Sequence, residues 1–489
     1  MLEFGKIEES EANYAAALTH YNQALDMYQQ IDHMDGVVKT YSCIAETYVN
    51  QTQYDSALEM LRKSLRIAEE NTFLLAKSKI YHLLGKIHHE KGENQQSLQY
   101  YSQALTMYQE QENRFEEAIQ LGNLAFIYED LGEYDKAISY YQQSIEMAQQ
   151  LGDKRTEGRQ LANLGSTYNA MGAYKDAISK FSQAIEIAKH IGDKRNEGSI
   201  LGNLGSIYKN QGDYEQAIVN YNKAIAIAQQ IGNKKSECTH WGNLALTYRY
   251  LGKNNEAIFY FQQAIDLAQQ NGNKRTEGRH LGNLGIIHQG MGEYEQAQKY
   301  FLQSLARAEE INDRRSIGSK LGDLGIISQN IGKPKEAIDY FNRSIAISRD
   351  IGDKRTQGIH LGNLGDALMK DGQLHASKKA ISESIAICDD VYPTAAGIFR
   401  GTLALLYMKE NNITQALKEM DNAEPMVKGF AYEYGKLLCK KSQILWKANQ
   451  KDQAQMALKK AITIEDDLQT GVESELSRGI RTLQKMLSV

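Results

Sequence analysis

The chain has 489 residues, and its 56 lysines and arginines almost balance its 61 aspartates and glutamates. A net charge of -5 excludes a generally basic surface, so we expect no binding to nucleic acid. The sequence has no run of about 18 apolar residues, and its start, MLEFGKIEESE, lacks the basic-then-apolar order of a signal peptide. Four cysteines stand far apart without a CxxC pair, which predicts reduced thiols. Together these features predict a cytoplasmic protein that does not contact a membrane.

A repeat of 40 residues organises most of the chain. Its spacing stays constant from position 121 to position 361, and weaker copies extend it back to Tyr81 and Tyr41. Residues 13–32 match only the second half of a unit, so we expect either a fragment or a divergent first unit. A long repeat in a chain with only 3 prolines is typical of a helical array, which grows by stacking units.

The pattern divides the chain into three parts. Residues 1–392 are predicted to form the array of 40-residue repeats, with the most regular copies in 113–392. Residues 393–469 carry two degenerate units. Residues 470–489 are predicted to form a C-terminal capping helix.

Each regular unit consists of two predicted helices. In the unit around Leu201, the first helix is predicted from about Asn196 to Asn210 and the second from about Tyr214 to Ile231. A glycine that suits a left-handed cap follows the first helix in most units: Gly132, Gly172, Gly212, Gly252, Gly292, Gly332 and Gly372. An Asp or Asn that suits the N-cap of the next helix follows the second: Asp153, Asp193, Asn233, Asn273, Asp313 and Asp353.

The order of large, small and aromatic residues in each unit resembles the tetratricopeptide repeat signature, carried here by Leu201, Leu204, Gly205, Tyr208, Ala217, Tyr221 and Ala224. The 40-residue period and the Gly-Asp-Lys-Arg link resemble the longer repeats of Pins-type polarity adaptors, kinesin light chains and bacterial signalling proteins. The resemblance covers about residues 1–469. It implies an all-α fold, a right-handed α-solenoid superhelix of stacked antiparallel helix pairs, but no particular biological role.

An asparagine recurs at one position of the first helix and forms a predicted ladder: Asn123, Asn163, Asn203, Asn243, Asn283 and Asn363, with Asp323 interrupting the series. A helix interior does not favour asparagine, whose amide carries both donors and an acceptor. Similar ladders hold peptides in other members of the family, so we expect these side chains to bind the backbone of an extended peptide in a concave groove. The alternative is that each asparagine bonds to a neighbouring helix and keeps the repeats in register.

A glycine precedes the ladder residue in six units: Gly122, Gly202, Gly242, Gly282, Gly322 and Gly362. Glycine costs about 1 kcal/mol against alanine in a helix interior, so its recurrence requires a reason. Close approach of a ligand backbone and tight packing between helices are two equal explanations. The small residue three positions after this glycine, such as Gly205, is predicted to serve packing alone.

Charged and apolar residues divide the same predicted face. Arg159 and Lys209 give this face a basic stretch, and Arg249 and Arg279 add positive charge further along. An arginine can bind a carboxylate through two parallel hydrogen bonds. Three aliphatic residues stand in register: Leu246, Ile286 and Ile326. We expect a ligand with acidic or polar residues over the basic stretch and apolar anchors over the aliphatic residues. The alternative is that a neighbouring unit covers the aliphatic side chains.

No catalytic, cofactor or metal motif is evident, and His240, His280 and His360 share one repeat position and so form an array rather than a cluster. We therefore expect a non-catalytic scaffold that binds a protein or an extended peptide. The alternative is a sensor module that controls an effector kinase, protease or nucleotidase. The first unit lacks a full helix, so Ala17, Tyr21 and Ala24 are expected to form an exposed edge that binds a partner or a second copy.

Overall fold

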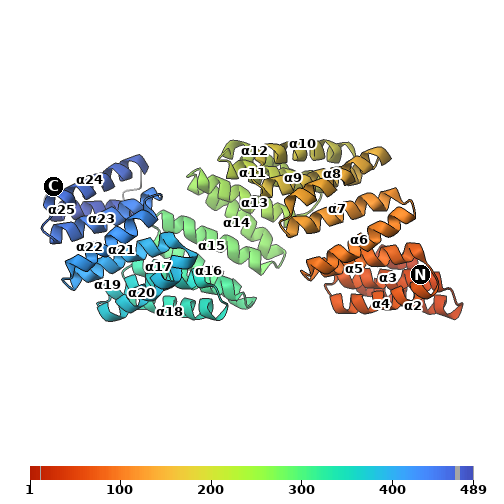
Figure 1. Ribbon diagram of the computed structural model, residues 1–489, viewed down its shortest axis with the longest axis horizontal. Helices are drawn as coiled ribbons and strands as arrows, with labels where there is room; N and C mark the ends of the chain where they lie inside the picture. Colours follow the sequence, from red (N-terminus) through yellow and green to blue (C-terminus); the bar gives the residue numbers. More distant parts are fainter. Residues whose placement is uncertain (11–12, 469–473, 488–489) are drawn as a thin grey trace. The chain divides into compact units, whose positions relative to one another are not determined.

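The computed structural model describes residues 1–10, 13–468 and 474–487, and every regular element in these ranges is an α-helix. The predicted all-α fold is therefore confirmed. The chain divides into two compact units, Met1–His240 and Trp241–Val489, with the division inside helix α13. Figure 1 shows the helices of each unit following one another as antiparallel pairs. We call the odd-numbered helix of each pair the A helix and the even-numbered one the B helix.

The bounds of the helices follow the repeat. Unit 1 holds α1 Leu2–Ser10, α2 Tyr14–Gln30, α3 Met34–Asn50, α4 Tyr54–Glu70, α5 Leu74–Glu90, α6 Asn94–Glu110, α7 Arg114–Asp130, α8 Tyr134–Leu151, α9 Lys154–Ala170, α10 Tyr174–His190, α11 Lys194–Asn210 and α12 Tyr214–Gln230. Helix α13 spans Lys234–Tyr250. Unit 2 continues with α14 Asn254–Gln270, α15 Lys274–Gly290, α16 Tyr294–Glu310, α17 Arg314–Asn330, α18 Pro334–Asp350, α19 Lys354–Lys370, α20 Leu374–Val391, α21 Pro393–Lys409, α22 Ile413–Val427, α23 Ala431–Lys447, α24 Lys451–Leu468 and α25 Glu475–Leu487.

The turns and caps form where the residue types predicted them. Gly212 follows α11 with a φ of 81°, a left-handed conformation that glycine adopts without a steric penalty. Asp193 caps α11, because its Oδ1 accepts a hydrogen bond from the Asn196 backbone N–H at 3.1 Å. Asp153 caps α9 in the same way through Thr156. Local chemistry therefore sets the ends of these helices.

Small residues allow the helices of a pair to pack closely. Ala217, Tyr221 and Ala224 of α12 are fully buried. A Cβ atom added to Gly205 of α11 would lie 2.8 Å from the Tyr221 ring, so that glycine leaves space for the tyrosine. The prediction that this small residue serves packing is confirmed, and large residues cannot replace it without displacing the ring.

The expected exposed edge at Ala17, Tyr21 and Ala24 is wrong. All three side chains are buried, at 0%, 0% and 3% exposure. Helix α1 packs against α2 and α3, and Glu9 Oε2 accepts a hydrogen bond from Tyr21 Oη at 2.8 Å. The sequence pattern did not reveal α1, because residues 2–10 do not match the repeat. Self-association at this end of the chain stays a prediction, but these three buried residues no longer support it.

The C-terminal helix α25 packs against α23 and α24. Its Leu476, Ile480 and Leu483 are buried there. A Cβ atom added to Gly435 of α23 would lie 3.0 Å from Leu476 Cδ2, so this glycine permits a close contact. The start of the predicted capping segment, residues 470–473, and its end at 488–489 lie outside the described residues.

Candidate functional site

The predicted ladder residues lie on the A helices, and the residues three and six positions later share their side of the helix. We call the surface that these positions form within each unit the ladder face. In unit 1 it comprises Asn123, Phe126, Glu129, Asn163, Ser166, Asn169, Asn203, Ser206 and Lys209. In unit 2 it comprises Asn243, Leu246, Arg249, Asn283, Ile286, Gln289, Asp323, Ile326, Gln329, Asn363, Asp366 and Met369.

The ladder asparagines differ in how the protein uses their amides. Asn123 Nδ2 lies 3.4 Å from His82 Nδ1 of the preceding repeat, and Asn163 Nδ2 donates to Gln160 Oε1 at 3.3 Å. Four asparagines make no side-chain hydrogen bond within the described part of the chain: Asn203, Asn243, Asn283 and Asn363. Asn203 is exposed and the other three are half-buried. These four amides therefore keep their donors and acceptors available to solvent or to a ligand.

The glycines beside the ladder serve packing between repeats. A Cβ atom added to Gly202 would lie 2.3 Å from His240 Cε1, and one added to Gly322 would lie 2.2 Å from His360 Cε1. Beside Gly122 the same space holds the Gln160 amide. Of the two explanations for these glycines, tight helix packing accounts for them without a ligand.

The cations on the ladder face and one turn before it are largely unpaired. Arg159 and Arg279 are exposed and form no ion pair with any described residue. Arg159 lies in a hollow between two repeats, and the resulting desolvation lowers the pKa of its guanidinium although Asp153 opposes the shift. Lys209 is half-buried, which lowers its pKa. Arg249 lies with Cζ 5.6 Å from the Tyr250 ring centroid.

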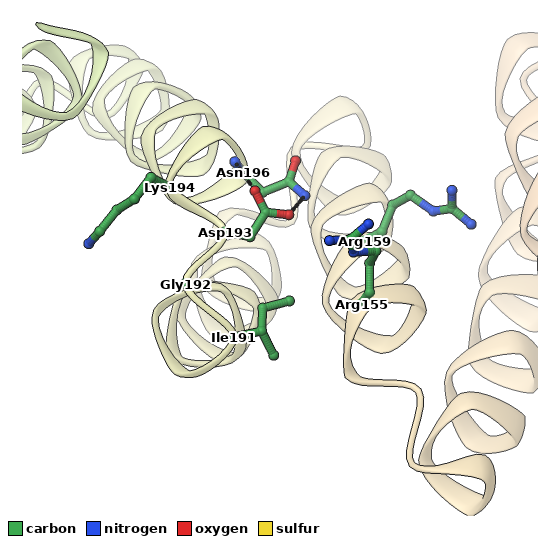
Figure 2. A pocket seen from close by; sticks show the side chains of 7 residues that line it. All are labelled: Arg155, Arg159, Ile191, Gly192, Asp193, Lys194 and Asn196. Atoms are coloured by element: carbon green, nitrogen blue, oxygen red, sulfur yellow. Dashed lines mark hydrogen bonds between the residues drawn. The ribbon is translucent and has the colours of Figure 1, made fainter. Parts of the chain in front are cut away.

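A pocket of about 480 Å³ opens between α9 and α11 in unit 1. We call it the Arg159 pocket; it is lined by Arg155, Arg159, Ile191, Gly192, Asp193, Lys194 and Asn196. Figure 2 shows the Arg155 side chain pointing across the pocket toward Asp193 and Asn196, whereas the Arg159 side chain extends away from them. Asp193 Oδ2 accepts a hydrogen bond from Asn196 Nδ2 at 2.7 Å, so this carboxylate already has a partner.

A related pocket of about 370 Å³ lies in unit 2 among α15, α16 and α17. We call it the Arg279 pocket; it is lined by Lys274, Arg275, Thr276, Gly278, Arg279, Gly282, Asn283, Ser304, Ala308, Ile311, Asp313, Ser316 and Lys320. The space beside Gly282 is wider than that beside Gly202: a Cβ atom added to Gly282 would lie 3.2 Å from its nearest neighbour, Lys320 Nζ, against 2.3 Å from His240 Cε1 at Gly202. Lys320 Nζ pairs with Asp323 Oδ2 at 2.5 Å. The ladder residue Asn283 therefore lines a hollow together with Arg279.

The three aliphatic residues of unit 2 are not equally exposed. Ile286 is 37% exposed. Leu246 packs against a core that includes Phe261, and Ile326 packs against one that includes Phe341. These two side chains are half-buried within the repeats, so the expected apolar stripe presents Ile286 most fully.

Two features of the ladder face were absent from the sequence prediction. Phe126 stands at the repeat position of Leu246 and is 42% exposed, with its ring 5.1 Å from that of His89. The 40-residue register alone would have revealed it. At the other end, the ladder position of α21 and α23 holds Thr402 and Lys440, and Lys440 Nζ donates to Thr402 Oγ1 at 2.9 Å. The amide series therefore ends at Asn363, since the following two positions bond to each other.

The described residues contain no group of three or more His, Cys, Asp and Glu side chains arranged to hold a metal ion. Among the described helices, none has both the length and the apolar character needed to cross a membrane. All four cysteines are free thiols.

Comparison with known families explains the repeat. A family model described as tetratricopeptide repeat matches residues 36–110, 114–190, 196–270 and 276–350, which together exceed half of the chain. The chain belongs to the tetratricopeptide repeat family. A second tetratricopeptide repeat model matches residues 435–468, within the part predicted to hold degenerate units. No curated protein matches the chain significantly in sequence.

Solved structures share the tetratricopeptide repeat fold at low sequence identity. The apo form of RapI is 12% identical to this chain and superposes with a TM-score of 0.53. The match covers 72% of this chain and 97% of the RapI chain. A signal transduction ATPase with numerous domains from Pyrococcus horikoshii, which has a tetratricopeptide repeat sensor, is 18% identical. This match covers 72% of this chain and 55% of the ATPase chain, with a TM-score of 0.52. These likenesses concern the fold.

Proposed function

We propose that this protein is a non-catalytic interaction scaffold that binds an extended peptide or partner segment along the ladder face. The observation that supports this most is the set of four ladder amides without an intramolecular hydrogen bond, Asn203, Asn243, Asn283 and Asn363. A primary amide can donate to a peptide carbonyl and accept from a peptide N–H at the same time. It therefore holds a peptide backbone whatever the sequence of the peptide.

Asparagine is also a costly choice on these helices. It is a weaker helix former than alanine by roughly half a kcal/mol, and here its amide makes no hydrogen bond within the described residues. Packing accounts for the neighbouring glycines, as it does for Gly205, but it leaves these four amides unexplained. Ligand binding supplies the missing reason. The apolar side chains of Phe126 and Ile286 are the anchors we propose for apolar residues of the ligand.

A peptide display selection against the full chain tests the proposal. The selected peptides are measured against the wild type and against Asn203→Ala/Asn243→Ala/Asn283→Ala. Losing three amide contacts should weaken binding on the order of hundredfold, because each hydrogen bond contributes about 1 kcal/mol. Helicity and the melting temperature should not fall.

The matched control is Asn222→Ala/Asn342→Ala, which makes the same change at exposed positions of the B helices α12 and α18. It should bind the peptides as the wild type does. Equal binding by the ladder variant and the wild type would contradict the proposal, and so would a selection that yields no binding peptide.

A sensor that controls an effector enzyme is the second candidate. The Pyrococcus horikoshii protein carries a tetratricopeptide repeat sensor, and its fold is similar to that of this chain. Hydrogen exchange measured with and without a selected peptide separates the two functions. A scaffold should show protection on the ladder face alone, whereas a sensor should also change exchange in B helices that do not touch the peptide. Free thiols at all four cysteines support a cytoplasmic setting for either function.

A further inference from the structure

Helix α1 occupies the place of the second half of an A helix. The carboxylate of Glu9 accepts hydrogen bonds from Tyr21 Oη at 2.8 Å and from Thr47 Oγ1 at 3.2 Å. The same two bonds recur three periods of 40 residues later, among Glu129, Tyr141 and Thr167. The positions of α1 can therefore be compared with those of α7 residue by residue.

Two positions that belong to the core in α7 are exposed in α1. Leu124 and Ile127 of α7 are 2% and 1% exposed, because they pack against the preceding B helix, α6. The equivalent residues of α1, Phe4 and Ile7, are 59% and 54% exposed. Met1 is 50% exposed, and its spacing of three residues from Phe4 places it on the same side. We call Met1, Phe4 and Ile7 the end face of unit 1.

The last described helix of unit 2 has a different outer surface. The exposed side of α25 carries Arg478, Thr482 and Lys485, with Met486 as the single large apolar side chain that is well exposed on this helix. A polar outer surface is what keeps the terminal element of a repeat array soluble. A head-to-tail contact between two copies would place the apolar end face against these charges. The end face of a second copy is the better match in this chain.

Opposite charges border the end face. The side chains of Glu3 and Lys6 are 78% and 49% exposed, and they pair with each other at 2.7 Å. In a two-fold contact, if residue i of one copy meets residue j of the other, then j also meets i. Antiparallel packing of two α1 helices would thus bring Glu3 of each copy near Lys6 of the other. On the opposite border, Glu8 is half-buried and accepts a hydrogen bond from Asn13 Nδ2 at 2.6 Å.

We propose that the end face of unit 1 binds the end face of a second copy, so that the protein forms a two-fold symmetric dimer through antiparallel α1 helices. Phe4 and Ile7 of the two copies then shield one another from water, as α6 shields Leu124 and Ile127 within the chain. A contact of this symmetry closes with two copies, so no larger assembly grows from it.

Sedimentation velocity of the full chain from about 1 to about 100 μM measures the association, because an interface of this small size is expected to dissociate in the micromolar range. Phe4→Asp/Ile7→Asp should weaken the dimer at least on the order of hundredfold, since it buries unpaired charges in the contact. Helicity should not fall, because both side chains are exposed in the single chain. The matched control is Phe259→Asp/Met456→Asp, at side chains that are 57% and 71% exposed on α14 and α24. It should dimerise as the wild type does.

A charge exchange tests the antiparallel arrangement. Glu3→Lys alone and Lys6→Glu alone should each weaken the dimer on the order of tenfold, because like charges then meet across the two-fold axis. An equal mixture of the two variants should dimerise as the wild type does, since each offers the charge that the other lacks. A wild type that stays monomeric throughout the concentration range would overturn the proposal. The same holds for a dimer that Phe4→Asp/Ile7→Asp leaves intact, for assemblies that grow beyond two copies, and for a mixture that does not recover.

Discussion

The imidazole of His280 occupies the space beside Gly242, where a Cβ atom would lie 2.3 Å from His280 Cε1. His280 is 3% exposed, and neither of its ring nitrogens has a hydrogen-bond partner. The ring therefore acts as a packing element between consecutive repeats. This contact joins two A helices of unit 2 at a point one residue away from the ladder residue Asn243.

Gly242→Ala should destabilise the protein. The added methyl group must displace a buried ring, and such overpacking costs about 1–3 kcal/mol, which exceeds the gain in helix propensity. Urea unfolding measures the change. Gly290→Ala is the control, because nothing lies within 4 Å of a Cβ added there, and it should stabilise by up to about 1 kcal/mol. Equal effects of the two changes would show that the His280 contact carries no energy.

Stability should decline as the pH falls below 6.5. Burial, assisted by the nearby Arg279, lowers the pKa of His280 from 6.5 to about 4, and burial also lowers the pKa of His240 and His360. The unfolded chain then binds protons at a higher pH than the folded chain does. The contribution of these neutral histidines to the unfolding free energy is therefore fully present above pH 6.5 and is lost as the pH falls toward 4. For His280 this loss amounts to about 3 kcal/mol.

His280→Gln is the matched variant for the pH dependence, because Gln160 occupies the same repeat position beside Gly122. Unfolding free energies measured from pH 7.5 to pH 4.5 should fall less steeply in this variant than in the wild type. An unchanged slope would mean that His280 is protonated in the folded protein at its ordinary pKa.

Asn203→Ala should not weaken the fold. The side chain is exposed and makes no hydrogen bond to a described residue, and alanine is the better helix former, so a gain of about 0.5 kcal/mol is expected. Leu204→Ala, one residue later, removes a side chain that is 6% exposed and should cost about 2–5 kcal/mol. Chemical denaturation compares them. A loss of more than 1 kcal/mol in Asn203→Ala would assign the ladder residue a structural role.

Thr72→Gly should stabilise the turn between α4 and α5. Thr72 has a φ of 57°, a left-handed conformation that disfavours a β-branched residue, and glycine holds the equivalent turn in most later repeats. We expect a gain of about 1 kcal/mol after the entropy cost of glycine. Thr106→Gly makes the same change on an exposed site within α6 and should lower stability by about 0.5–1 kcal/mol. Melting curves of both variants provide the measurement.

The sequence by itself determined the helix pairs of the regular repeats and the turns that join them. Gly212 and Asp193 act through φ angles and hydrogen bonds within three residues of themselves, so residue type alone predicted them. The register of the ladder followed in the same way, because a constant period places Asn163 and Asn203 at the same position of successive A helices.

Only the tertiary structure decided which of these side chains remain available. Packing between consecutive A helices places His240 beside Gly202, and α1 covers Tyr21. No local sequence pattern predicts either contact. The same is true of Ile286, which stays exposed while Ile326 is half-buried against the core of its own repeat. Such contacts join residues far apart in the sequence, and their geometry depends on side chains of both repeats, which a 40-residue period cannot specify.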